Sequence, residues 1–160
     1  MMRNFPFLAR DERGSTLVEL SLALPFMAAM LVGMVDLSRG FSHKLQLEQA
    51  AQRSIEKAMQ GKKKTTLFAT LQAEAVEAAG VTPSAVDVRY WLECNGVTQY
   101  KGKATMTVDY EAVCPNGQAY ARYVEVTITK NYAPMFTTKF LGSKSDGTFD
   151  VVGTSGLRVQ

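Results

Sequence analysis

A stretch without a single charged side chain, from Leu20 to Val35, constrains the fold of this chain more than any other feature. It consists mainly of Leu, Ala, Met and Val, with one proline, Pro25. A helix needs about 20 predominantly apolar residues to cross a bilayer, and the wider segment from Leu17 to Leu37 has that length. The segment from Arg39 to Lys64 is instead rich in Lys, Arg, Glu and Gln. The sequence therefore predicts one membrane helix followed by soluble polypeptide.

The residues that flank this stretch predict its orientation. Arg3, Arg10 and Arg13 precede it, and basic residues near a span favour the cytoplasmic side. A soluble domain of about a hundred residues is translocated largely regardless of its charge. We therefore expect a cytoplasmic N-terminus and an extracytoplasmic C-terminal domain. Cys94 and Cys114 both follow the span, so an oxidising compartment would allow them to form a disulfide.

The remaining composition excludes several classes of function. The net charge is only +3 and is spread along the chain, so binding of nucleic acid is not indicated. The only histidine, His43, provides neither a metal site nor a catalytic triad. Asp109 and Glu111 are two residues apart but have no recognisable pocket around them. We expect no enzymatic activity, no metal and no cofactor.

Two simpler explanations of the N-terminus are a secretory signal peptide and an uncleaved single-span anchor. A signal peptide would carry its cleavage site after the apolar region, whereas polar residues here follow only from Asp36. A plain anchor does not account for Glu19, because a carboxylate in a membrane helix costs about 2–3 kcal/mol at mid-bilayer and needs a partner. Cleavage after Gly14 would create one, the new amine of Ser15, one helical turn before Glu19.

The same segment resembles the N-terminal signature of TadE-like proteins, which are pseudopilins of the tight-adherence (Flp) pilus system. The residues that carry the resemblance are Arg13-Gly14-Ser15-Thr16-Leu17-Val18-Glu19-Leu20, then Leu24-Pro25, Gly33, Asp36 and Arg39. The resemblance implies processing by a prepilin peptidase after Gly14, with Glu19 as the fifth residue of the mature chain and an assembly residue. Leu20 stands where pilins of this system usually carry an aromatic residue.

This resemblance implies a division of the chain into a cytoplasmic leader (1–14), a transmembrane and assembly helix (15–37), an amphipathic helix stalk (38–60) and an extracytoplasmic α+β head (61–160). The implied partners are a prepilin peptidase, other Tad pseudopilins, the major Flp pilin, the pilus assembly platform and inner-membrane lipid. The implied location is the inner membrane as a single-pass protein with a periplasmic head, and the cell surface as part of the pilus.

The fold class that we expect is α+β and type IV pilin-like, with a long N-terminal helix, a second helix and a small antiparallel sheet. The N-terminal helix would extend from Ser15 to Gln60, as one helix or as two nearly collinear ones. One broad apolar face is expected on its second half, made of Phe41, Leu45, Leu47, Ala51, Ile55, Ala58 and Met59. The second helix is predicted over Thr65 to Ala79, closed by Gly80.

Alternating apolar residues predict two half-buried strands, one from Val86 to Glu93 and one from Val124 to Thr129, which Pro134 should terminate. Thr105 to Glu111 could add a strand in a simple meander. A Cys94–Cys114 bridge argues against that meander, because it would place the two cysteines at opposite ends of a strand about 25 Å long. The segment from Asn95 to Val113 is therefore interpreted as an excursion that leaves the sheet and returns.

The function that follows is structural: a minor pilin or pseudopilin that acts in assembly or at the tip of a Tad/Flp pilus, in surface attachment. The C-terminal part also resembles TadE-like chains at Asn131 to Phe136, Phe149 to Val152 and Leu157 to Val159. The alternative is a membrane-tethered extracytoplasmic binding module outside any pilus, capturing a ligand through exposed aromatic residues: Trp91, Tyr90, Tyr100 and Tyr110.

Overall fold

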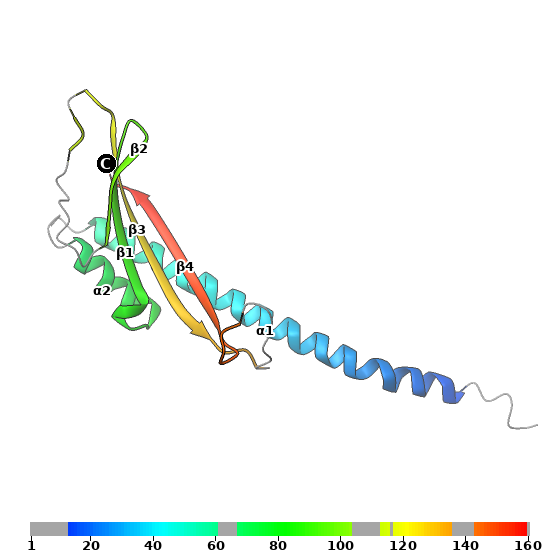
Figure 1. The fold of residues 1–160 in the computed structure, drawn as a ribbon. Helices are drawn as coiled ribbons and strands as arrows, with labels where there is room; N and C mark the ends of the chain where they lie inside the picture. The colour runs from blue at the N-terminus through cyan, green and yellow to red at the C-terminus, as the bar shows by residue number, and fades with distance from the viewer. Residues whose placement is uncertain (1–12, 61–66, 104–112, 116, 136–142, 160) are drawn as a thin grey trace, which may run out of the picture. The chain divides into compact units, whose positions relative to one another are not determined.

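The structure is a computed structural model that describes residues 13–60, 67–103, 113–115, 117–135 and 143–159 (Figure 1). The chain divides into two compact units, Met1–Arg39 and Gly40–Gln160. Helix α1 (Arg13–Gln60) contributes to both units, whereas all other elements belong to the second unit. These elements are α2 (Leu67–Ala79), the short 3-10 helix η2 (Pro83–Ala85), β1 (Val86–Cys94), β2 (Val97–Lys103), β3 (Tyr120–Tyr132) and β4 (Phe149–Arg158).

The four strands form one antiparallel sheet with the order β2-β1-β3-β4. Strand β1 alternates strictly between buried and half-buried residues, as the sequence pattern predicts for a strand with one covered face. It turns directly into β2 through Asn95 and Gly96, whose φ angles of 48° and 79° are those of a type I′ hairpin turn. The α+β, pilin-like fold class is confirmed.

The order of the strands excludes the simple meander, because β3 pairs with β1 and not with β2. The excursion after Asn95 begins as the hairpin strand β2, which sequence analysis did not recognise as part of the sheet. The candidate strand from Thr105 to Glu111 lies outside the described residues. Strand β3 ends at Tyr132, two residues before Pro134, as expected.

The core of the second unit lies between one face of the sheet and the helices α1 and α2. The residues that build it are Leu47, Ala50, Ala51, Ile55, Leu71, Ala75, Val86, Val88, Tyr90, Val124, Val126 and Ile128. Ser54 is also buried and donates its hydroxyl to the Ala51 carbonyl at 2.7 Å, so the polar atom is satisfied within its own helix.

The apolar face predicted for the second half of α1 is partly wrong. Phe41, Leu45 and Met59 are 60%, 41% and 42% exposed, whereas Ala50 and Ser54 take core positions that the prediction omitted. The reason is that helix and sheet lie very close together, so small residues are needed at the contact. A wide stripe of large side chains would hold them apart.

Strand β4 approaches α1 very closely at Gly153. A Cβ atom at this position would lie 2.5 Å from the Cβ of Leu47 and 2.6 Å from the amide nitrogen of Glu48. Real Cβ atoms essentially never come this close to a backbone atom, so only glycine fits without movement of the helix. Gly153 therefore fixes how β4 meets α1.

Helix α2 is held on the sheet by Leu71 and Ala75, which are 1% and 0% exposed. It ends at Gly80, whose φ of 60° allows the Val81 amide to donate to the Val76 carbonyl at 3.3 Å. This is the helix end that the sequence predicts. The start predicted at Thr65 lies outside the described residues.

Candidate functional site: the exposed N-terminal helix

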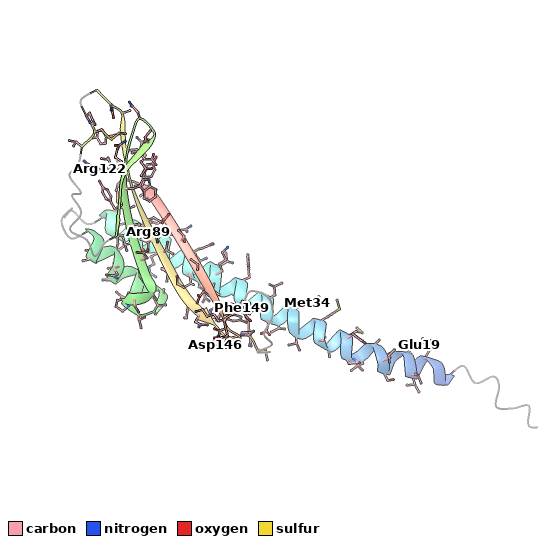
Figure 2. All side chains as sticks on the ribbon, in the orientation of Figure 1. Glu19, Met34, Arg89, Arg122, Asp146 and Phe149 are labelled. Atoms are coloured by element: carbon pink, nitrogen blue, oxygen red, sulfur yellow. A yellow bond between two sulfur atoms is a disulfide. The ribbon has the colours of Figure 1, made fainter. Side chains whose placement is uncertain are left out.

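The first part of α1, up to Arg39, exposes its apolar side chains on all sides. Leu17, Leu22 and Phe26 are each 71% exposed, and Leu37 is 76% exposed. These positions do not share one face of a helix, so a core-facing stripe cannot explain them. Figure 2 labels Glu19 near the start of this helix and Met34 farther along it. A helix of this kind requires an apolar environment that the described chain does not itself provide.

By length and composition, α1 is the one helix in the described part of the chain that is able to cross a membrane. A signal sequence near the N-terminus passes the same test. The segment is therefore a membrane anchor or a signal sequence.

Polar groups inside the apolar segment are satisfied locally. The Ser21 hydroxyl donates to the Val18 carbonyl at 2.8 Å, so this side chain needs no water. The helix continues without interruption through Pro25, where one backbone N–H is missing. The Ser21 hydroxyl is therefore compatible with a lipid environment, in which each unsatisfied polar group costs several kcal/mol. Pro25 instead leaves the backbone carbonyl four residues earlier without its usual donor, which neighbouring helices can satisfy in a membrane.

The predicted processing and assembly residues lie at the start of α1. Gly14 and Ser15 are in its first turn, and Glu19 follows Ser15 by four residues, a rise of about 6 Å. The Glu19 side chain is exposed. The leader up to Glu12 lies outside the described residues, so cleavage after Gly14 stays a prediction, as does the pairing of Glu19 with the new amine.

The structure joins Cys94 and Cys114 in a disulfide, with Cα atoms 5.7 Å apart. Cys94 is the last residue of β1 and is 3% exposed. The neighbouring Asn95 forms two further links to the segment before β3: its amide donates to the Ala119 carbonyl at 2.8 Å, and its side-chain oxygen accepts from the Ala119 amide at 3.1 Å. The bridge thus returns the chain from β2 to the start of β3.

Of the aromatic residues of the alternative function, the structure describes the side chains of Tyr90 and Trp91. Tyr90 is fully buried in the core, so its prediction as a ligand-binding residue is wrong. Trp91 lies on the opposite face of the sheet, stacked on Tyr123 with ring centroids 5.1 Å apart, and its indole N–H donates to Glu93 at 3.1 Å. The stack covers one face of the Trp91 ring. The Tyr100 side chain and Tyr110 lie outside the described residues.

Of the residues considered for chemistry, the structure describes His43 only. His43 is half-buried against the Tyr132 ring, with centroids 5.5 Å apart. Among the described residues there is no group of three His, Cys, Asp or Glu side chains that could hold a metal ion. Asp109 and Glu111 lie outside the described residues.

The fold and the exposed helix together define a class: a pilin-like α+β protein with an N-terminal apolar helix that continues into the core of its head. Residues 14–55 match the family model of TadE-like proteins. This segment is therefore similar to TadE-like proteins, which are pilus-associated and generally not enzymes. A comparison with curated proteins gave no match, and a comparison with solved structures gave none.

Proposed function

We propose that this chain is a minor pilin, or pseudopilin, that acts in the assembly or at the tip of a Tad/Flp type IV pilus. The observation that carries the proposal is the coincidence of three features on one segment. The TadE-like match over residues 14–55 covers the Gly14–Glu19 motif and the exposed apolar helix, and it extends into the part of α1 that forms the core of the head.

In this proposal the helix from Ser15 to Leu37 waits in the inner membrane, with the head on the periplasmic side. A prepilin peptidase removes residues 1–14. The helix then leaves the bilayer and packs among the helices of other Tad pseudopilins and the major Flp pilin on the assembly platform. The large exposed apolar surface supports this exchange, because both lipid and neighbouring helices can cover it.

Glu19 has a specific role in this account. After cleavage, its carboxylate neutralises the amine of Ser15 in its own chain or in a neighbouring subunit. This pairing removes the cost of about 2–3 kcal/mol that a lone carboxylate carries in a membrane helix. Since the pair exists only after cleavage, it couples processing to assembly.

The test is the amount of protein in sheared pili. Glu19→Ala should leave cleavage unchanged and reduce incorporation at least tenfold. Ser21→Ala is the matched control, because the Ser21 hydroxyl donates its hydrogen bond to the Val18 carbonyl in the same helix turn. Incorporation of Glu19→Ala at the level of the unmodified protein would exclude the proposed role of Glu19. Absence of the unmodified, cleaved protein from pili would favour the tethered binding module instead.

A further inference from the structure

The second unit carries a hollow of about 340 Å³ between α1, the end of α2 and β3. Its apolar lining residues are Leu47 and Ala50, which are buried, together with Ala78 and Ala79. Its rim carries His43 and Arg53 from α1 and Lys130 from β3, together with the amides of Gln46 and Gln49. No carboxylate is among the described residues that line it.

Of the positive groups of this hollow, Lys130 has no carboxylate partner in the described part of the chain, whereas Arg53 also borders a second hollow that contains carboxylates. The adjoining smaller hollow shares Arg53 but also contains Glu74 and Glu77, and there Lys57 is paired with Glu74 at 2.5 Å. No described carboxylate forms an ion pair with Lys130. The end of α2 contributes roughly half a negative charge, which two full positive charges exceed. The hollow therefore favours an anion.

The covalent connection to the apolar helix limits where this hollow can lie. Gly40 follows Leu37 by three residues, at most about 10 Å of extended chain, and His43 is one further helical turn away. The sheet is attached at the same point, because a Cβ atom at Gly40 would lie 3.7 Å from the Tyr132 ring. If the helix ends its span at Leu37, the His43 end of the hollow stays within about 15 Å of the apolar core at any angle between the two units.

We propose that this hollow binds the phosphate of an anionic phospholipid headgroup while the protein waits in the membrane. The polar layer of a bilayer extends about 5–8 Å beyond the apolar core, so lipid phosphates are within reach of His43 and Lys130. Tethering also raises the local concentration of headgroups to the millimolar range or above, so weak binding suffices. The inference rests on the membrane location in the proposed function but not on cleavage or assembly.

The test uses the full-length protein in neutral detergent micelles, titrated with a short-chain phosphatidylglycerol and, separately, with inorganic phosphate. The NMR signals of the Lys130 side-chain ammonium and the His43 ring report binding. Phosphatidylglycerol should shift both signals saturably, and Arg53→Gln with Lys130→Gln should weaken binding at least tenfold. Arg89→Gln with Arg158→Gln removes the same charge from other positions and should change binding less than twofold.

Three results would overturn the inference. The first is the absence of a saturable shift of the NMR signals with phosphatidylglycerol. The second is an equal weakening of lipid binding by both pairs of substitutions. The third is equal saturation of the signals by inorganic phosphate, which would indicate a site for a soluble anion. An unfolded double variant is recognised from the fluorescence of Trp91. In that case the single variant Lys130→Gln, exposed on β3, replaces it and should weaken binding at least threefold. If the hollow does not bind the lipid, the predictions of leader cleavage and pilus incorporation still stand, because these are measured separately.

Discussion

Replacing Gly153 by alanine should push β4 and α1 apart. The added Cβ would lie 2.5 Å from the Leu47 Cβ and 2.6 Å from the Glu48 amide nitrogen, against about 3.5–4.0 Å for an ordinary contact. The helix must therefore move by about 1 Å over a well-packed core. Overpacking of this kind costs about 1–3 kcal/mol, while the lower entropy of the unfolded alanine chain returns about 0.4–1 kcal/mol. A net loss of about 1–2 kcal/mol is expected, and more for Gly153→Val.

The assay is urea unfolding of the full-length protein in detergent, followed by the fluorescence of Trp91. This is the only tryptophan and lies in β1, so it reports on the head and not on the apolar helix. Gly156→Ala in the same strand is the matched control, because its Cβ would lie 3.4 Å from the nearest atom, the Val124 carbonyl oxygen. Equal stability of the two variants would refute the close approach between β4 and α1.

Three further predictions concern the head. Reduction of the disulfide, or the double substitution Cys94→Ser with Cys114→Ser, should lower the free energy of unfolding by about 3 kcal/mol, because the bridge closes a loop with a sequence separation of 20. Urea unfolding with and without reductant measures this loss. Leu71→Ala should cost about 2–5 kcal/mol by the same assay, because this side chain is 1% exposed between α2 and the sheet; a cost below 1 kcal/mol would contradict the packing of α2. The hydrogen bond from the Thr148 hydroxyl holds the pKa of Asp146 below its ordinary value of 3.8. The stabilisation from this group is therefore present above that value and is lost as the pH falls through the lower folded pKa, and Thr148→Val should raise the pKa measured by NMR.

Local patterns predicted those elements whose residues carry their own signals. The alternation in β1 follows from the pleat of a strand. The end of α2 at Gly80 follows from a residue that tolerates positive φ. The prediction that the strands do not form a simple meander is also confirmed. It rests on the short distance between the Cα atoms of two bridged cysteines, which does not depend on the rest of the fold.

The features that sequence analysis missed depend on contacts between distant segments. Strand β2 lacks a clear apolar alternation because it is an edge strand, with Val97 at 61% exposure. The core-facing residues of α1 were partly misassigned, because the buried positions include the small residues Ala50 and Ser54, whereas the larger Phe41, Leu45 and Met59 are exposed. The cationic hollow needs Arg53 and Lys130 from elements far apart in the sequence. The sequence around Arg53 and around Lys130 gives no indication that the two residues line the same hollow.

The measurement that tests the account most directly is the intact mass of the protein produced with and without a prepilin peptidase. With the peptidase, the account predicts a mass lower by residues 1–14 and an N-terminus at Ser15. Without the peptidase, the N-terminus should stay at Met1. An N-terminus at Met1 under both conditions would contradict the account, since Glu19 would then have no amine to pair with.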